Sequence, residues 1–255
     1  MMTHEEHTEK WSELWSSVSD LKHKEEGSSM WLFYEEFLKD YDFSGKRVIE
    51  LGCGTGINSI IMARLGADVT FLDISEKALD IVRKNAEKFG VKAEYIHGNI
   101  FDFDGKEEYD LVHSEGVVEH FLPPYRQRII DIHAEAIKKG GKALIIVPNK
   151  ACPGYVIGKY ISNKIGNWVY GDEYPYSHFE LKKRIEMAGL KPGKRSGGEF
   201  VTSCVWFMAP LFLSSKSFMK RSLRFVPGRR MLKLDQGHRV ANKIGRIIGV
   251  LATKS

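Results

Sequence analysis

The strongest constraint on the fold is a regular alternation of short apolar runs and helical patterns between Lys46 and Leu190. The apolar runs are continuous, which is typical of strands buried on both faces of a parallel sheet. Helices between such strands return the chain by right-handed crossovers. The sequence therefore predicts an α/β fold with helices on both faces of a mostly parallel sheet. The expected strands are 46–51, 68–72, 93–97, 109–114 and 142–147, and the expected helices are 57–65, 76–89, 124–139 and 177–188.

Three segments lie outside this alternation. Residues 1–41 carry two amphipathic helical patterns and are predicted to form an N-terminal helical cap. Residues 148–176 are rich in Tyr and Trp, and residues 199–238 join an uncharged apolar run to a basic one. At 255 residues we expect a single domain, in which 42–147 is the ligand-binding core and the two later segments are insertions that cover a substrate.

Charge is unevenly distributed along the chain. The net charge is +5, but residues 191–255 hold 14 Lys and Arg against two acids, which leaves +12 there and −7 on the first 190 residues. A basic tail on an acidic body indicates an anionic partner, such as a membrane surface or nucleic acid, or else a solvated face.

The cysteines and the N-terminus bear on the compartment. Cys53, Cys152 and Cys204 stand far apart without a CxxC pair, which argues against a disulfide framework or zinc finger and fits a reducing compartment. The acidic, polar start does not resemble a signal peptide, and no apolar run is long enough to span a membrane. We therefore expect a cytoplasmic protein, with peripheral membrane contact as an option.

The most specific local signal is the sequence VIELGCGTGINS at 48–59. A buried strand ends at Leu51, glycines follow at 52, 54 and 56, and a helix then begins. Glycines allow a tight turn and a close approach of the backbone to a ligand, and the helix N-terminus presents free N–H groups to the same crevice. A dinucleotide fingerprint, GxGxxG, would need a third glycine where Ile57 stands. A plain strand–helix turn is the other alternative.

Asp73 ends the next predicted strand, 17 residues after Gly56. A carboxylate at this position can accept two hydrogen bonds from a ribose diol. Alternatively, Asp73 is an acid at a helix N-terminus beside Ser75. Together with the glycine turn, it favours an adenosine-containing ligand.

At this point the sequence resembles a known family. The motifs ELGCGTG at 50–56, LDIS at 72–75, GNIFDF at 98–103 and YDLVHSEGVVEHF at 109–121 occur in order. They are similar to the successive motifs of class I S-adenosylmethionine-dependent methyltransferases, above all the type 11 small-molecule branch with the ubiquinone and menaquinone methyltransferases. The resemblance covers roughly residues 45–190 and the final strand. It implies a Rossmann-like, seven-stranded sheet whose last strand, within 244–253, is antiparallel.

The resemblance implies S-adenosyl-L-methionine as cofactor and assigns residues to it. The family usually has Asp where Asn99 stands, but an amide offers both a donor and an acceptor to adenine. The implied roles are the methionine part for Glu50, Gly52, Cys53, Gly54 and Gly56, the ribose for Asp73, adenine for Ile74, Asn99 and Ile100, and the neighbourhood of the sulfonium for Ser114 and Glu115.

Methyl transfer from a sulfonium is an in-line displacement, so the protein mainly positions the acceptor and excludes water. A base is needed only when the acceptor is a hydroxyl, and the candidate is His120, whose ordinary pKa suits proton removal near neutral pH. His120 could instead cap or pack the following helix. His113 and His178 are weaker candidates.

Quinone-type relatives can hold a divalent ion at this loop with acids and a histidine. Glu115, Glu119 and His120 are of that type, but the first acid is one residue out of the relatives' register, with Gly116 in its place. We therefore expect no metal.

The acceptor is expected to be small and hydrophobic: aromatic, quinone-like or lipid. The aromatic residues of 148–176 suit such an acceptor, although they could equally form an ordinary packed loop. The 199–238 segment, with seven basic residues from Lys216 to Lys233, predicts a lid or a peripheral contact with an anionic membrane surface.

Two alternative functions remain. The basic tail could indicate a nucleic-acid methyltransferase, but the LPPY sequence at 122–125 has Leu where an N-methylating motif has an amide, and it lies eight residues past the fourth strand's tip. A non-catalytic cofactor-binding protein is disfavoured by the intact Glu50, glycines and Asp73.

Overall fold

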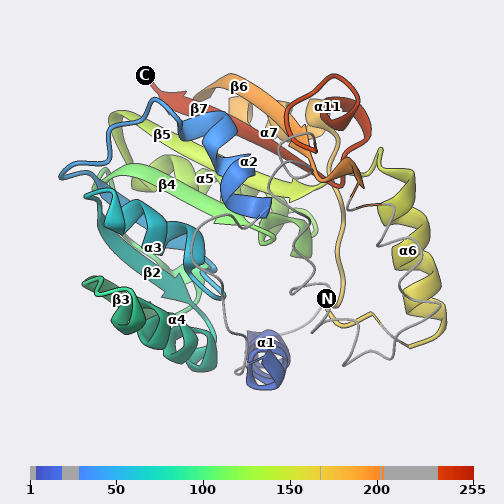
Figure 1. Cartoon of the computed structure of the whole chain (residues 1–255), viewed down its shortest axis with the longest axis horizontal. Coiled ribbons are helices and arrows are strands. Elements are labelled where there is room, and N and C mark those ends of the chain that lie inside the picture. Colours follow the sequence, from blue (N-terminus) through green and yellow to red (C-terminus); the bar gives the residue numbers. More distant parts are fainter. Residues whose placement is uncertain (1–3, 19–28, 167, 202, 204–234) are drawn as a thin grey trace.

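The computed structural model describes residues 4–18, 29–166, 168–201, 203 and 235–255. Its centre is one sheet of seven strands: β1 (Arg47–Leu51), β2 (Asp68–Asp73), β3 (Ala93–His97), β4 (Tyr109–Glu115), β5 (Ile137–Pro148), β6 (Leu190–Gly198) and β7 (Ile247–Lys254). Their order is β3-β2-β1-β4-β5-β7-β6 (Figure 1). β7 runs antiparallel to β5 and β6, whereas the pairs among β1 to β5 are parallel. The predicted α/β fold and antiparallel last strand are confirmed.

β6 is the strand that the sequence patterns did not locate. Its sequence, LKPGKRSGG, contains Pro192 and three glycines and lacks an apolar run. It pairs only with β7, so it is an edge strand, where proline is tolerated because its missing N–H faces away from the ladder. The register shifts between Pro192 and Arg195. A strand of this kind cannot be recognised by hydrophobic periodicity.

The helices match the predicted ranges closely. At the start of the helix predicted over 177–188, Ser177 Oγ accepts from Glu180 N at 3.1 Å, while the Glu180 carboxylate pairs with Arg126 and Arg184. The helices are α1 (His4–Val18), α2 (Ser29–Leu38), α3 (Ile57–Arg64), α4 (Glu76–Lys88), α5 (Tyr125–Ala136), α6 (Pro153–Lys164), α7 (His178–Met187) and α11 (Ala241–Ile244), with short 3₁₀ turns η1 (Ile100–Asp102) and η2 (Val118–His120).

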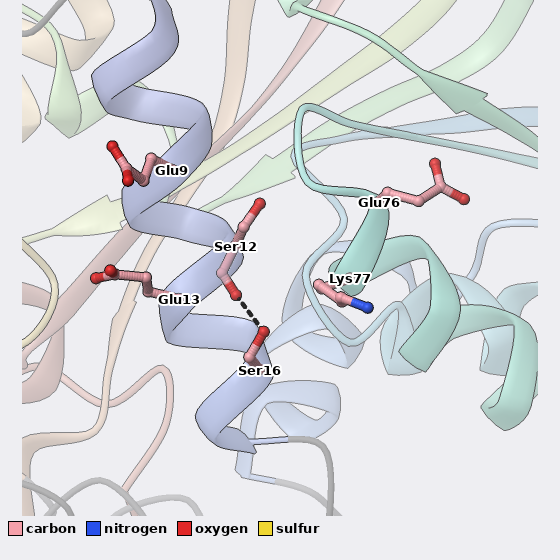
Figure 2. Close-up of a pocket in the computed structure, with 6 residues that line it drawn as sticks. All are labelled: Glu9, Ser12, Glu13, Ser16, Glu76 and Lys77. Atoms are coloured by element: carbon pink, nitrogen blue, oxygen red, sulfur yellow. Dashed lines mark hydrogen bonds between the residues drawn. The ribbon is translucent and has the colours of Figure 1, made fainter.

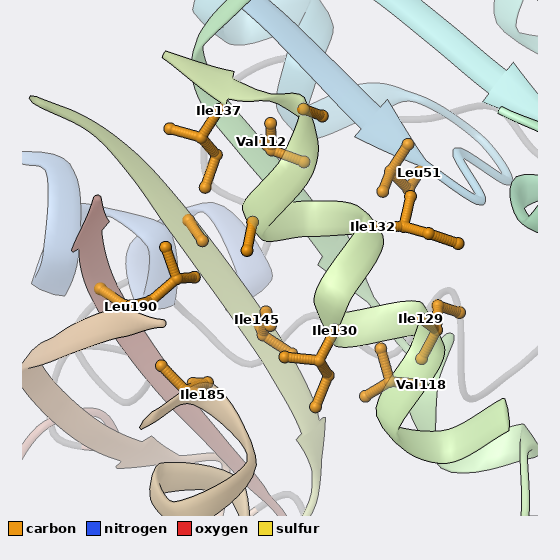
Figure 3. Packing of buried hydrophobic residues seen from close by; sticks show 14 of the residues in the cluster. Leu51, Val112, Val118, Ile129, Ile130, Ile132, Ile137, Ile145, Ile185 and Leu190 are labelled. Carbon is orange, nitrogen blue, oxygen red and sulfur yellow. The ribbon is translucent and has the colours of Figure 1, made fainter. Parts of the chain in front are cut away.

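The sheet separates two hydrophobic clusters. On one face, α5 and α7 pack on β4, β5 and β7, and Figure 3 shows Ile129 and Ile130 of α5 lying against the sheet. On the other face, α2, α3 and α4 cover the sheet through residues such as Phe33, Phe71 and Val82. Both faces are therefore buried, as the continuous apolar strands predicted.

The N-terminal segment does not form one cap. α2 belongs to the core, because Phe33 and Phe37 pack against β7 at Gly249. α1 alone lies away from the sheet, below the ends of the strands in Figure 1. Its buried residue Leu14 packs with aromatic and apolar neighbours.

The segment 148–176 contains a helix that the patterns did not predict. α6 begins after Cys152, whose sulfur accepts from Tyr155 N, and Pro153 at its first position suits a helix start. The segment returns to the sheet through a parallel bridge between Asn149 and Tyr176. Most of the predicted 199–238 insertion, including the basic run 216–233, lies outside the described residues. Among the helices the structure does describe, none has the length and apolarity to cross a bilayer.

The strand order reverses between β1 and β4, which lie side by side at the centre of the sheet. In an open parallel sheet, loops on either side of such a reversal leave in opposite directions and open a crevice at the carboxyl ends of the strands. The glycine turn follows β1, and the SEGVVEH sequence follows β4. The fold therefore brings the predicted cofactor and acceptor motifs to one crevice.

We expect Ile130→Ala to destabilise the fold by about 2–5 kcal/mol, because Ile130 is fully buried between α5 and the sheet and its removal leaves a cavity. Chemical denaturation followed by circular dichroism measures this change. The matched control is Phe179→Ala, since Phe179 is 74% exposed and its loss should change stability by less than about 0.5 kcal/mol. Equal effects of the two substitutions would contradict the packing described here.

Candidate functional site

The glycine turn between β1 and α3 is built as the sequence predicted. Gly52, Gly54 and Gly56 have φ angles of 71°, 53° and 66°, a region that L side chains rarely adopt. A Cβ on Gly52 would lie 2.7 Å from Val117 in the loop after β4. The turn therefore packs directly against the second loop of the crevice, and no other residue type fits there.

Asp73 supports this turn from the end of β2. Its Oδ2 accepts from Gly54 N at 3.0 Å and from the Cys53 thiol at 3.8 Å, and its Oδ1 accepts from Ser75 N at 2.9 Å. Burial raises the pKa of Asp73, although these hydrogen bonds oppose that shift. A carboxylate has further lone pairs, so the ribose role stays a prediction.

Glu50 is the most unusual group of the turn. It is 4% exposed, and its Oε2 atom is buried without a hydrogen-bond partner in the structure. Its pKa is raised to about 8, chiefly by burial and also by the nearby Glu115 and Asp73, against a hydrogen bond from Ser59 that lowers it. An unpartnered buried carboxylate oxygen costs free energy, so it fits a position that a ligand donor fills.

The predicted adenine residues lie at the ends of β2 and β3. Asn99 Oδ1 accepts from Phe101 N at 3.0 Å and so caps η1. Ile100 is buried in the α5-side cluster, and Ile74 is half-buried with its carbonyl 3.1 Å from His97 Nε2. Their predicted contacts with adenine stay predictions.

Ser114 and Glu115 at the tip of β4 point to opposite faces of the sheet, as neighbours in a strand must. Ser114 Oγ lies 2.9 Å from His133 Nε2 on the α5 face. Glu115 Oε2 accepts from Asn58 Nδ2 of α3 at 3.0 Å, and burial raises its pKa to about 8. The Ser114 side chain is thus engaged away from the glycine turn, whereas Glu115 lies beside it.

His120 lies in η2, directly after β4. Its Nδ1 is 2.8 Å from the Asp172 carbonyl oxygen. Because a carbonyl oxygen can only accept a hydrogen bond, Nδ1 carries the proton of the neutral ring. Trp11 of α1 meets the ring edge-on at 4.9 Å. Burial lowers the pKa of His120 to about 4. Its Nε2 is consequently an unprotonated acceptor at neutral pH.

An acidic cluster surrounds this nitrogen. Glu119 Oε1 lies 3.9 Å from His120 Nε2, and one ligand atom each of Glu119, His120 and Glu173 lie within 4.8 Å of one another. Burial raises the pKa of both carboxyls, and the charge of Glu173 raises that of Glu119 further. Tyr155 of α6 donates to Glu173 Oε2 at 2.5 Å.

These three side chains also fit a divalent cation. Two carboxylates and an imidazole are suitable ligands, and Glu119 Oε2 is buried without a hydrogen-bond partner. The expectation of no metal considered Glu115 as the third ligand. The structure places Glu173 there instead.

Several site residues were not identified from the sequence. Glu173 and Tyr155 lie in the 148–176 segment, more than 30 residues from His120, and no local pattern marks them. The buried ion pair between Arg246 and Glu199 lies near Glu115, since both charges affect its pKa. Only spatial proximity reveals these groups.

α1 covers the crevice from outside. The indole of Trp15 occupies the space over Gly54, 2.8 Å from where a Cβ would stand, and Ser12 Oγ lies 3.3 Å from Ser75 Oγ at the start of α4. Figure 2 shows the outward side of this contact, where α1 faces α4 across a shallow groove. Its lining residues are Glu9, Ser12, Glu13, Ser16, Glu76 and Lys77. None of these residues belongs to the glycine turn, so this outer groove is separate from it.

Comparison with known proteins agrees with this geometry. Residues 48–141 match the family model described as a methyltransferase domain. The chain is 30% identical over 173 residues to the ubiquinone biosynthesis O-methyltransferase of Ruegeria sp. strain TM1040, a match that covers 66% of this chain and 69% of that protein. It is 29% identical over 199 residues to the Aromatoleum aromaticum enzyme of the same name, covering 74% of this chain and 83% of that one.

Solved structures share the fold. Magnesium protoporphyrin IX methyltransferase from Synechocystis PCC 6803, solved with bound SAH, has a TM-score of 0.57 at 17% identity, covering 100% of this chain and 89% of that one. The same enzyme with bound SAM gives 0.54 at 16% identity, covering 97% of this chain and 81% of that one. The ubiquinone biosynthesis O-methyltransferase relatives favour the small-molecule interpretation over the nucleic-acid and non-catalytic alternatives. The chain belongs to the class I S-adenosylmethionine-dependent methyltransferases, of the branch that methylates small molecules.

Proposed function

We propose that this enzyme methylates a hydroxyl group of a small, hydrophobic, quinol- or catechol-type acceptor. The observation that carries the proposal is His120, a neutral imidazole whose Nδ1 faces the Asp172 carbonyl, at the strand tip next to the cofactor turn. The names of the ubiquinone O-methyltransferase relatives support the same acceptor class. The aromatic residues of α1 and the 148–176 segment around Leu14 support an apolar wall for it.

The transfer is an in-line displacement at the methyl carbon. The bond between the sulfonium sulfur and the methyl group breaks as the bond from the acceptor oxygen forms, and S-adenosylhomocysteine leaves. The hydroxyl proton passes to His120 Nε2. Because Asp172 holds Nδ1 as a donor, the ring turns Nε2 toward Glu119 and Glu173. In their ionised forms these carboxylates stabilise the imidazolium that forms.

The cofactor is held at the glycine turn. Glu50 accepts from the ammonium of its methionine part, which gives the unpartnered Oε2 a donor. Asp73 meets the ribose, and Ile74, Asn99 and Ile100 lie along the adenine. The half-buried Glu115 faces the reacting sulfur from β4.

A divalent cation is a second use of the acidic cluster, favoured by the orphaned Glu119 Oε2. Glu119, His120 and Glu173 would hold it, and it would lower the pKa of the acceptor hydroxyl as a Lewis acid.

We further propose that the enzyme meets its acceptor at an anionic membrane surface. The seven basic residues between Lys216 and Lys233 support this from the sequence. In the structure, the outer side of α6 exposes Val156, Ile157 and Tyr160, next to the segment that reaches His120. Apolar side chains bordered by basic ones are typical of an interfacial surface.

The proposed cofactor role of Glu50 predicts that replacing it weakens cofactor binding but stabilises the folded protein at high pH. Its folded-state pKa of about 8 exceeds the unfolded value near 4.5, so its stability contribution is complete below pH 4.5 and is lost as pH rises through about 8. Gln cannot ionise and avoids this loss. We expect Glu50→Gln to abolish calorimetric S-adenosylhomocysteine binding, while its unfolding free energy relative to wild type rises by roughly 2–3 kcal/mol between pH 5 and pH 9.

The matched control for that experiment is Glu87→Gln, on the exposed side of α4. This variant should bind like the wild type and show the wild-type dependence of stability on pH. Unchanged affinity in Glu50→Gln would remove Glu50 from the cofactor site.

If His120 is the base, His120→Ala should lower turnover on alkyl-substituted catechols and hydroquinones by about 10²–10⁴-fold, with cofactor affinity retained. Because the pKa of His120 is about 4, the wild-type rate should not fall through titration of this group until the pH drops below about 5. Release of S-adenosylhomocysteine measures the rate. His178→Ala, whose imidazole instead contacts the Asn242 carbonyl, should leave it near normal.

Near-normal turnover of His120→Ala would show that His120 is not the base and has only a packing role. A wild-type rate that falls on chelation and recovers with Mg²⁺ or Zn²⁺ would favour the cation over direct proton transfer.

The membrane proposal predicts binding to vesicles rich in anionic lipid and weak binding to neutral ones. Each basic residue near an anionic surface contributes about 1 kcal/mol, and salt above about 0.5 M should release the protein. Co-sedimentation measures this binding. Reversing Arg229 and Arg230 to Glu should weaken it, whereas reversing Lys88 and Lys92, on the far side of the sheet, should not. If the protein does not co-sediment with anionic vesicles at low salt, the proposal is refuted.

A further inference from the structure

A chain of four buried polar side chains runs through the otherwise apolar face of the core beneath α2 and α3. Tyr34 comes from α2, His113 from β4, Ser59 from α3 and Glu50 from β1. The first three have no exposed surface, and Glu50 is 4% exposed. None of Tyr34, His113 and Ser59 has a part in the proposed methyl transfer.

The hydrogen bonds of this chain share one direction. Tyr34 Oη lies 3.0 Å from His113 Nδ1, and His113 Nε2 lies 2.7 Å from Ser59 Oγ. Burial lowers the pKa of His113 to about 3, so the ring is neutral and carries one proton. Burial also keeps the Tyr34 hydroxyl protonated by raising its pKa. A neutral imidazole donates from one nitrogen only, so the direction is set at the Glu50 end. When Glu50 is ionised, the Ser59 hydroxyl donates to it, Ser59 Oγ accepts from His113 Nε2–H, and Nδ1 accepts from Tyr34.

The series of hydrogen bonds ends at the Glu50 carboxylate. Glu50 Oε2 has no partner in the structure. The ionisable groups that face Glu50 include Asp73 from β2 and Glu115 from β4, both of which disfavour its ionised form. The others are neutral: His113, Tyr34 and the Cys53 thiol, whose pKa burial raises. Ser59 is accordingly the donor that opposes these effects. Its own hydrogen is directed to Glu50 because His113 occupies its acceptor side.

We propose that Tyr34, His113 and Ser59 are positioning residues that hold Glu50 in its ionised, cofactor-binding orientation and so set the pH range of cofactor binding. This inference rests on the proposed contact between Glu50 and the cofactor ammonium. If these side chains only filled space, Phe at 34, an apolar residue at 113 and Ala at 59 would do so without the free-energy cost of burying polar groups. The directed chain polarises Ser59 and strengthens its donation to Glu50.

The pH dependence follows from the protonation of Glu50. In the free protein its pKa is about 8, so at pH 7 the carboxyl is mostly protonated and must lose a proton to accept from the ammonium. Affinity therefore falls as pH drops below about 8, and binding there releases a proton. Removal of the Ser59 donor raises the pKa of Glu50 further, so the fall begins at a higher pH.

Calorimetric titration of the full chain with S-adenosylhomocysteine between pH 6 and 9.5, in buffers of different ionisation enthalpy, tests this inference. We expect Ser59→Ala to bind about 3- to 10-fold more weakly than wild type at pH 7 and nearly as well at pH 9.5, as fits loss of one hydrogen bond to a carboxylate. Tyr34→Phe should act in the same direction by about twofold, because it removes only the polarising end of the chain.

Tyr109→Phe is the matched control. Tyr109 is a buried tyrosine at the start of β4, at the opposite edge of the sheet from the crevice, and its loss of a hydroxyl should leave the pH profile unchanged. Thermal unfolding shows whether each variant is folded. If Ser59→Ala does not fold, Tyr34→Phe, which retains the aromatic ring, still tests the inference.

An affinity loss that is equal at all pH values, or absent, in both variants would overturn the positioning role. A wild-type protein that binds no S-adenosylhomocysteine at any pH would instead refute the proposed function itself, so the two failures are distinguishable.

Discussion

The functional half of the molecule depends on the reversal of strand order between β1 and β4. These two strands pair in parallel through Val48, Ile49 and Glu50, yet their following loops diverge to opposite faces of the sheet. The glycine turn can therefore enter α3 while the β4 loop enters η2, with Gly52 in van der Waals contact with Val117 between them. Every proposed cofactor and acceptor group lies at the carboxyl edge that this reversal opens.

That edge concentrates carboxylates in a largely dry environment. Glu50, Glu115, Glu119 and Glu173 all have raised pKa values, with burial as the main cause. Neighbouring acids raise the pKa of the first three further, among them Glu115 for Glu50 and Glu173 for Glu119. Such an arrangement opposes folding as pH rises, since each group would be ionised in the unfolded chain. Under the proposed cofactor contacts, the ammonium and sulfonium charges would offset this cost.

The sequence predicted most of this frame and part of the site. Long apolar runs and amphipathic helices marked β1 to β5, because those elements bury contiguous surface that leaves a periodic pattern. β6 escaped because an edge strand with Pro192 and three glycines has no such pattern. Glu50 and Asp73 were assigned from the motifs around the glycine turn, and the structure places Asp73 Oδ2 3.0 Å from Gly54 N, while their contacts with the cofactor stay predictions. Glu173 could not be assigned in this way, since it reaches His120 only through the path of α6.

Strand alternation explains one further difference between expectation and structure. Sequence motifs treat Ser114 and Glu115 as one unit, but successive side chains of a strand face opposite layers. Glu115 consequently shares its layer with His113, Tyr34 and α3, whereas Ser114 joins His133 of α5. The odd-numbered residues of β4 therefore face the α3 layer. Of these, His113 lies inside the core and Glu115 lies at the strand tip, so one strand face connects the buried hydrogen bonds to the proposed cofactor site.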